Sequence, residues 1–450
     1  MKQNINVIVK IPRELFDLID ADLDRTHIHA TERVGFITTK SQMLSSTECL
    51  ILMTGYNPVQ DDHYIKDHSV GAHIDSDAII IAMQRIMTNK CGQFHVHKHW
   101  GDGVPDFSPT DMRGLSPVMK SFQVDSLEPH GLFLINADSF NCLVWLPGNE
   151  DPVYADQISI IGYPLKQVYP KVHSIPEMPE KLDRQSFLGE DSHWFLNKIK
   201  IGIVGLGGGG SHVMQQAAHV GIGNIILFDP DYVEKTNLNR MVGASELDAK
   251  NKTPKVSTAE RLIKAVNPDA NVIPIEDKWQ NHSLELHKCD IVFGCIDSLV
   301  GRRDLEAECR KYLIPYIDVG MDVYQYNNER PAVRGQIILS MPGDLCCTCY
   351  GFLSEENLAE EVGKYGDAGG LPQVIWSNGV LSSTAIGIAV DLITGWSGQK
   401  SRRVYLSYNG NTNIVIPHIN GDFPSNRKCI HFPFNNVGPT IWGKPKKNKL

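Results

Sequence analysis

The pattern of apolar and polar positions changes character near residue 198. From there, short β-branched runs alternate with glycine turns and amphipathic stretches, as in "KIKIGIVGLGGGGSHVMQQAAHVGIGNIILFDPD" over 198–231. This alternation predicts a Rossmann-like, mainly parallel α/β sheet. Upstream the pattern is weaker, with a helix predicted for "DAIIIAMQRIM" and strands for "HGLFLINAD" and "NCLVWLP". The fold class is therefore α/β, with an α+β domain ahead of the Rossmann-like one.

A stretch rich in proline and charge, "YPLKQVYPKVHSIPEMPEKLDRQ", separates these two textures. Such composition favours extended, exposed backbone. We therefore predict an N-terminal domain over 1–165, a linker over 166–183, a second domain over 184–425 and a tail over 426–450. The sequence contains no run of 18 apolar residues and no signal-peptide pattern, so we expect a cytoplasmic protein.

Composition narrows the class of function. The chain has 450 residues, 42% hydrophobic and 21% charged, and a net charge of −9, which argues against a general nucleic-acid binder. The basic run "KPKKNKL" at the C-terminus is expected to be a solvated tail. The ten cysteines are scattered except for "CCTC" at 346–349, a pattern that suits reduced thiols and a metal site better than a disulfide framework.

The strand "KIGIVG" runs directly into the glycine-rich loop "GLGGGGS" and a helix that begins near Ser211. Glycines in this loop allow a tight turn and let backbone N–H groups face a phosphate at the helix N-terminus. The next strand ends in acidic residues, where a ribose hydroxyl would be met. Read alone, these features indicate a dinucleotide-dependent dehydrogenase, with close helix–sheet packing as the alternative explanation of the glycines. The candidate residues are Gly205, Gly207, Gly208, Gly210, Asp229 and Asp231.

The motifs that follow, "VEKTNLNRM", "NKTPKVSTAERLIKAVNP" and "CDIVFGCIDSLVGRRDL", occur in a fixed order. This series resembles the ThiF/MoeB-like adenylyltransferase family, which includes the ubiquitin-activating enzymes. The resemblance implies that Asp229 and Asp231 bind the ribose of ATP and that Asp297 holds Mg²⁺. It also implies triphosphate contacts from Asn237, Arg240 and Lys255.

Adenylation brings a carboxylate to the α-phosphate of ATP, so cations must neutralise the charge that develops as pyrophosphate leaves. Arg240, Lys255 and Mg²⁺ at Asp297 would supply that charge. Arg184 is similar in place to an arginine that family members donate across a homodimer, although a linker arginine would also explain it. The resemblance therefore implies a homodimer.

Two features depart from the family pattern. Members often bind a structural zinc ion with two CxxC pairs, whereas here Cys346 and Cys349 form one pair and Cys429 and His431 are the remaining candidates. Four unrelated residues are the alternative to a zinc site. The segment "GDAGGLPQVIWSNGV" lacks the cysteine that accepts an acyl group in activating enzymes, which leaves Cys346 or Cys347 as candidates for a thioester.

The stretch "HVHKHW" at 95–100 is followed by "FSPTD" at 107–111. His95 and His97 would point to the same side of a strand. With Asp111 they would give three zinc ligands and an open fourth position, as in catalytic zinc sites. A general base is also needed. Glu32 is the first candidate and Glu48 the reserve.

The arrangement E…HxH…SxxD resembles the JAMM metalloprotease motif of the MPN/JAB family, which cleaves at the C-terminus of ubiquitin-like proteins. The resemblance implies that Ser108 stabilises the oxyanion of the transition state. His99 is expected outside the ligand set. An inactive MPN-like fold and a polar turn with incidental histidines are the alternatives.

Together the two resemblances imply a bifunctional enzyme. A zinc protease would trim or deconjugate a ubiquitin-like protein, and an ATP–Mg²⁺-dependent domain would adenylate a C-terminal glycine. Partners would be a small protein ending in glycine and a conjugating enzyme. One alternative is a sulfur-carrier or peptide adenylyltransferase in biosynthesis. Another is a non-catalytic module that binds a ubiquitin-like protein.

Overall fold

The structure is a computed structural model that describes residues 5–67, 70–124, 126–324, 330–364, 372–421, 427–433 and 436–438. The basic tail and residues 366–371 of the cysteine-free segment lie outside these ranges. The chain divides into two compact units. Unit 1 consists of residues 1–161, 166–174 and 434–438, and unit 2 consists of residues 162–165, 175–433 and 439–450.

Unit 1 is built on a mixed sheet with the strand order β7-β6-β5-β4-β2-β3-β1-β8-β9. Parallel pairing joins β1 to β3 and β8, and β4 to β5, while the other neighbours are antiparallel. Its strands are β1 Asn6–Pro12, β2 Val34–Ser45, β3 Glu48–Pro58, β4 Gly92–Lys98, β5 His130–Ile135, β6 Phe140–Trp145, β7 Val153–Tyr154, β8 Gln157–Ile161 and β9 Lys166–Val168. Its helices are α1 Arg13–Leu23, α2 Ser76–Asn89, α3 Pro109–Phe122 and the 3-10 turn η1 Asp61–His63.

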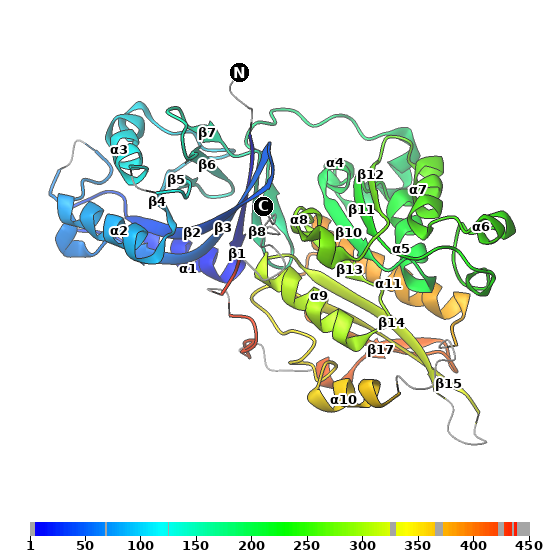
Figure 1. Cartoon of the computed structure of the whole chain (residues 1–450). Helices are drawn as coiled ribbons and strands as arrows, with labels where there is room; N and C mark the ends of the chain where they lie inside the picture. The colour runs from blue at the N-terminus through cyan, green and yellow to red at the C-terminus, as the bar shows by residue number, and fades with distance from the viewer. Residues whose placement is uncertain are drawn as a thin grey trace, which may run out of the picture. The chain divides into compact units, whose positions relative to one another are not determined.

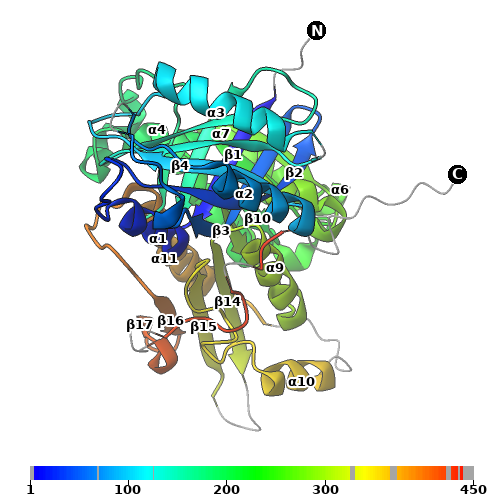
Figure 2. The same ribbon diagram turned by 90° about the vertical axis from the view of Figure 1, so that its left-hand side faces the viewer.

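Both faces of this sheet are buried. Apolar residues of α1, including Ile19, pack into a core on one face. Residues of α2 and α3, including Ala82 and Met119, form the core of the other face, which Figure 2 shows towards the viewer. Phe94 and Val96 of β4 belong to the α1 side. Because side chains alternate along a strand, the histidines of β4 point to the face covered by α2 and α3.

Unit 2 has an eight-stranded sheet in the order β12-β11-β10-β13-β14-β15-β16-β17. Its strands are β10 Lys200–Val204, β11 Asn224–Phe228, β12 Asn271–Ile275, β13 Ile291–Gly294, β14 Tyr316–Tyr324, β15 Ala332–Ser340, β16 Val404–Asn409 and β17 Ile414–Pro417. Its helices are α4 Ser192–Lys198, α5 Gly208–His219, α6 Glu246–Asn251, α7 Lys255–Val266, α8 Ser283–His287, α9 Leu299–Lys311, α10 Glu355–Lys364 and α11 Ile375–Thr394. Short 3-10 turns are η2 Glu180–Leu188, η3 Lys235–Asn237, η4 Trp279–His282 and η5 Ile419–Gly421.

The first five strands of unit 2 in sheet order are parallel and the rest are antiparallel. The chain moves from β10 to β11 in one direction across the sheet and from β13 to β14 in the other. Right-handed crossovers then place α5 and α9 on opposite faces of the sheet, where Figure 1 shows them. Ligands of such sheets bind beyond the carboxyl ends of the strands where the direction reverses, which here is between β10 and β13.

The predicted strands and helices of both halves are confirmed, with small differences at their ends. The predicted linker, however, contains β9, which pairs with β8, and its residues 166–174 belong to unit 1. The predicted tail is likewise divided, because 427–433 lie in unit 2 and 436–438 in unit 1. Segments this short carry too little apolar periodicity to be predicted. Among the described residues, no helix has the length and apolarity needed to span a membrane.

Candidate functional site

A cavity of about 470 Å³ lies at the carboxyl ends of β10, β11 and β13 in unit 2. The structure brings nearly all of the predicted nucleotide-site residues to its wall, from the glycine loop, the acidic strand end and the three motifs that follow. They are Gly205, Gly207, Gly208, Asp229, Asp231, Asn237, Arg240, Lys255 and Asp297.

The glycine loop is shaped by close backbone approaches. Gly205 has a φ of 88°, and a Cβ there would lie 2.6 Å from the carbonyl oxygen of Cys295. Gly210 is buried in the first turn of α5, where a Cβ would lie 1.8 Å from the carbonyl oxygen of Gly205. These glycines let α5 begin at the cavity wall, so its unpaired N–H groups and positive dipole end are available to an anion.

The acidic and basic groups of the cavity pair with one another. The Nζ of Lys255 lies 2.8 Å from Asp231 and 3.7 Å from the buried Asp229. The backbone N–H of Leu206 donates to Asp229 at 2.6 Å. Burial raises the pKa of Asp229, and Lys255 and the N–H group of Leu206 oppose that shift. Asp229 therefore links the glycine loop to Lys255.

Asp297 is exposed at the cavity, and Arg240 is half-buried there. Arg240 donates through Nη1 to the carbonyl oxygen of Thr236 at 2.5 Å and to Asn239 at 3.0 Å. Asp297 immediately precedes Ser298, whose side chain caps α9. An exposed carboxylate beside a phosphate-sized anion site is the kind of ligand that Mg²⁺ takes. The described residues thus fit ATP and Mg²⁺ by chemistry and placement.

The cavity wall also contains polar residues that were not predicted, including Gln373, Asn378 and Arg302. Gln373 donates to Asp297 at 3.4 Å, and Asn378, from the first turn of α11, lies so close that a Cβ on Gly208 would be 2.4 Å from its Nδ2. Arg302 comes from the first turn of α9. These residues lie in the sequence stretches "GRRDL" and "QVIWSN", the second within the cysteine-free segment. Only the tertiary fold shows that they reach the cavity.

Arg184 lies elsewhere. It is an exposed residue of η2 and does not line the cavity of its own chain. On the same turn, Phe187 is 68% exposed and packs edge-on against Trp396, which is 50% exposed.

In unit 1, the ligand atoms of His97, His99 and Asp111 lie within 4.8 Å of one another. The Nε2 atoms of the two histidines are each 3.5 Å from an oxygen of Asp111. Tetrahedral zinc bonded to nitrogen and oxygen at about 2.0–2.2 Å would hold such atoms about 3.4 Å apart. Both ring nitrogens of His97 are buried without a hydrogen-bond partner among the described residues, which is unusual for a polar group and fits a metal ligand.

This group differs from the predicted ligand set, because it contains His99 and not His95. The ring of His95 is 4% exposed and packs edge-on against Phe36. Burial and the neighbouring His97 lower the pKa of His95 to about 3. The two-residue period makes all three histidines equivalent in sequence. The N-terminus of α3, which carries Asp111, lies beside the later pair.

Ser108 and Asp111 form a capping box at the start of α3. The Oγ of Ser108 accepts from the N–H of Asp111 at 3.1 Å, and Asp111 accepts from the N–H of Ser108 at 2.7 Å. Burial alone would raise the pKa of Asp111, but His97 and the bonds from Ser108 hold it well below its usual range. The SxxD spacing therefore has a structural role in helix capping in addition to the predicted chemical one.

The strand register separates the two predicted bases. Val34 pairs with His97 at one end of β2, whereas Ser45 pairs with Glu48 at the other. Eleven residues of strand correspond to roughly 35 Å, so Glu48 is remote from the metal group. Glu32 lies two residues before Val34, at the same end of β2 as His97.

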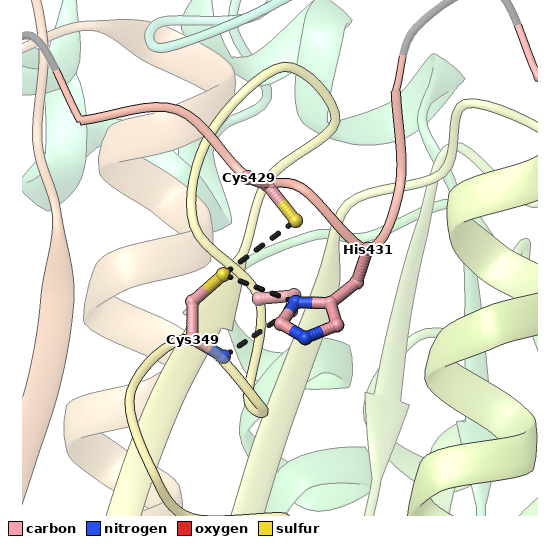
Figure 3. A group of neighbouring side chains, drawn as sticks. Cys349, Cys429 and His431 are labelled. Atoms are coloured by element: carbon pink, nitrogen blue, oxygen red, sulfur yellow. Dashed lines mark hydrogen bonds between the residues drawn. The ribbon is translucent and has the colours of Figure 1, made fainter.

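A second group joins the "CCTC" loop to the C-terminal segment of unit 2. The ligand atoms of Cys346, Cys349, Cys429 and His431 lie within 4.8 Å of one another. Figure 3 shows Cys349 directed at both Cys429, with the sulfur atoms 3.7 Å apart, and His431, with Sγ and Nδ1 3.3 Å apart. A zinc tetrahedron with Zn–S near 2.3 Å has S–S edges of about 3.8 Å and S–N edges of about 3.6 Å. The four residues fit a structural zinc ion.

The candidates for a thioester are poorly placed. Cys346 belongs to this four-residue group, and Cys347 is fully buried, with its backbone N–H donating to Glu306 at 2.8 Å. Burial and the charge of Glu306 raise the pKa of the Cys347 thiol well above its usual value. A buried thiol that stays protonated is a poor nucleophile.

The fold and the cavity define unit 2 as a Rossmann-like nucleotide-binding domain. The model of the ThiF family matches residues 181–429, more than half of the chain. The chain belongs to the ThiF family, and unit 2 is its ATP-dependent adenylyltransferase domain.

Two curated relatives agree with this assignment, and a solved structure is also similar. Molybdopterin-synthase adenylyltransferase of Haemophilus influenzae is 32% identical over 168 residues, which cover 35% of this chain and 68% of that protein. SAMP-activating enzyme E1 of Haloferax volcanii is 30% identical over 165 residues, 36% of this chain and 57% of that protein. The structure of E. coli MccB with ATP aligns with a TM-score of 0.45 and 24% identity, over 57% of this chain and 76% of that one.

Proposed function

We propose that unit 2 adenylates the C-terminal glycine carboxylate of a small ubiquitin-like or sulfur-carrier protein. The observation that carries this proposal is the gathering of the glycine loop, Lys255, Arg240 and Asp297 around one cavity. The names of the curated relatives, a molybdopterin-synthase adenylyltransferase and a SAMP-activating enzyme, support a protein substrate.

The chemistry follows from these placements. N–H groups at the start of α5 and the side chains of Lys255 and Arg240 bind and orient the triphosphate, and Asp229 and Asp231 accept from the ribose hydroxyls. Asp297 would hold Mg²⁺, which supplies charge neutralisation on the leaving pyrophosphate. A substrate carboxylate oxygen forms a bond to the α-phosphorus as the bond to pyrophosphate breaks.

Exchange of labelled pyrophosphate into ATP, dependent on a small protein ending in glycine, tests the activity. Asp297→Ala and Arg240→Ala should each abolish exchange and leave the fold intact, since Asp297 is exposed and Arg240 is only half-buried. Normal exchange in either variant would contradict the assigned roles.

We propose that the product remains an acyl adenylate or passes to an acceptor outside the described residues, since Cys346 and Cys347 are unsuited to a thioester. An acyl adenylate that forms no thioester on this chain supports the sulfur-carrier or peptide route and protein conjugation equally. Transfer of sulfur to a metabolite, as opposed to conjugation to lysines with the help of a conjugating enzyme, would distinguish the two.

We also propose that unit 1 is a zinc metalloprotease that trims or deconjugates the same partner. The observation that favours this function is the convergence of His97 and His99 on Asp111, with the nitrogens of His97 unpaired. Taking His97 and His99 as the histidine pair leaves eight residues before Ser108, whereas the pair His95 and His97 leaves ten. The shorter gap brings the sequence closer to the JAMM motif that it resembles.

In this proposal His97, His99 and Asp111 would hold zinc, which supplies Lewis-acid chemistry. Glu32 takes a proton from water and Ser108 donates to the oxyanion. Purified protein should contain zinc and cleave a ubiquitin-like protein extended beyond its terminal glycine. Glu32→Ala should retain the zinc of unit 1 and lose cleavage, whereas His99→Ala should lose cleavage and one of the two zinc ions expected per chain. Wild-type protein that contains no zinc beyond that of the four-residue group of unit 2, and that is inert on extended partners, would leave unit 1 as a binding module.

Finally, we propose a homodimer in which Arg184 of one copy reaches the nucleotide cavity of the other. The exposed pair Phe187 and Trp396 beside Arg184 supports this, because large exposed apolar side chains next to one another favour burial in an interface. A monomer by light scattering at micromolar concentration, with full exchange activity, would exclude the role.

A further inference from the structure

Arg302 is a charged residue of the cavity with no role in the scheme above. It lies five residues after Asp297, and its side chain is only 7% exposed although it lines the cavity. Its Nη1 donates to Asp318 at 2.6 Å and to the carbonyl oxygen of Val319 at 3.3 Å. One edge of the guanidinium is therefore fixed.

The acceptor that fixes Arg302 is itself immobilised. Asp318 is fully buried and also accepts from the hydroxyl of Tyr316 at 2.8 Å and from Nε2 of Gln336 at 3.1 Å. A buried charge is tolerated when it is paired and hydrogen-bonded in this way. The network holds the guanidinium in one orientation, because a planar fork with one edge anchored has little freedom left.

The other edge of the guanidinium faces Gly320, another residue of the cavity wall. A Cβ on Gly320 would lie 2.8 Å from Nη2 of Arg302 and 2.4 Å from Nε2 of Gln336. In the described part of the chain, no residue accepts a hydrogen bond from Nη2. The missing side chain at 320 thus leaves a donor edge beside the cavity.

Adenylation requires two anions in one cavity. Lys255, Arg240 and the group held by Asp297 serve the triphosphate, so the scheme assigns no cation to the second anion, the attacking carboxylate. Lys278 and Arg302 are the remaining cations of the cavity wall, and of these Arg302 is the one held in a fixed orientation. We propose that the free edge of Arg302 binds the C-terminal carboxylate of the acyl substrate. This inference rests on the adenylation proposed for unit 2.

The role is consistent with the bonds that change. One carboxylate oxygen forms the bond to the α-phosphorus, and the electron pair of the broken bond leaves with pyrophosphate. The other oxygen becomes the carbonyl oxygen of the acyl adenylate, and no proton is transferred. Arg302 would bind that second oxygen throughout the reaction. It is therefore a substrate-binding residue that should contribute to the binding of an acyl adenylate and not to the binding of ATP alone.

The test compares two probes by calorimetry on the full chain: ATP with Mg²⁺, and glycylglycyl-sulfamoyl adenosine, a stable mimic of the acyl adenylate. Loss of a hydrogen bond to a charged group costs about ten- to a hundredfold in affinity. Arg302→Gln, combined with Asp318→Asn so that no buried charge is left unpaired, should weaken the acyl probe by that factor and ATP by less than threefold. Gly320→Ala, which crowds the free edge, should act in the same direction.

Equal weakening of both probes would overturn the inference in favour of a phosphate contact or a structural role, and unchanged binding of the acyl probe would overturn it outright. If the double variant unfolds, Gly320→Ala and Arg302→Lys give the same comparison. Wild-type protein that binds neither probe would contradict the adenylation itself, whereas wild-type binding of both with indifferent variants would contradict only the role of Arg302.

Discussion

Alanine at position 210 should destabilise unit 2, although glycine to alanine within a helix ordinarily stabilises. In an exposed helix the exchange is favourable by about 0.5–1 kcal/mol. At Gly210 the new Cβ would lie 1.8 Å from the carbonyl oxygen of Gly205, well inside a contact that real Cβ atoms essentially never make. Overpacking against backbone costs about 1–3 kcal/mol or more, so the sign of the effect reverses.

The neighbouring residue provides a matched control. At Gly209, in the same turn of α5, a Cβ would lie 3.6 Å from the nearest atom, which is ordinary contact. Thermal unfolding of the two variants by calorimetry is the assay. With about 2–4 °C per kcal/mol for a domain approaching this size, Gly210→Ala should lower Tm by roughly 2–12 °C, and Gly209→Ala should leave it unchanged or slightly raised. A Gly210→Ala protein as stable as the wild type would refute the close approach that shapes the phosphate loop.

Three further predictions concern other parts of the molecule. Gly71→Ala should reduce cleavage by unit 1 about tenfold while the zinc content stays constant, because a Cβ there would lie 2.3–2.5 Å from the carboxyl atoms of Glu32. Gly114→Ala is the control, because a Cβ there meets nothing within 4 Å. Equal cleavage activity of the two variants would contradict the placement of Glu32. Cys429→Ser should remove about one zinc ion per chain by elemental analysis and Cys91→Ser none, and unchanged zinc in the first variant would exclude the four-residue site. Asp248→Asn should cost about 1–3 kcal/mol at pH 7, because Arg261 and the bonds from Ser245 hold the folded pKa of Asp248 well below its usual value. That stabilisation is fully present above the unfolded pKa near 4 and is lost progressively as pH falls from there towards the folded pKa. The difference in Tm between variant and wild type should therefore shrink steadily as pH is lowered below about 4, and a constant difference would contradict it.

The nucleotide site was predictable because its parts are contiguous in sequence. The glycine loop and the acidic strand end depend on local geometry, and parallel strands carry their carboxyl ends to one edge of the sheet. Each motif therefore arrives at the cavity once the strand order is known. Arg302, Gln373 and Asn378 were not predictable in the same way, since nothing local distinguishes them from surface residues of α9 and α11.

The histidine stretch shows a different limit. A strand period of two makes His95, His97 and His99 equivalent, and only the position of α3 selects the last two. Cys429 and His431 were candidate partners of the CxxC pair because family members often bind zinc there and because both side chains can ligate it, although they follow the pair by some eighty residues. Chemistry restricts which residue types can meet, while tertiary packing decides which copies do.

Pyrophosphate exchange with carrier proteins that differ only in their C-terminal group, a free carboxylate or an amide, tests the central claim most directly. A sulfur-carrier protein and a ubiquitin-like protein, each ending in glycine, would be compared with the same proteins carrying a C-terminal amide. The adenylation site predicts exchange that requires the free carboxylate, Mg²⁺ and Asp297. Exchange that is indifferent to amidation, or that persists in Asp297→Ala, would contradict the account.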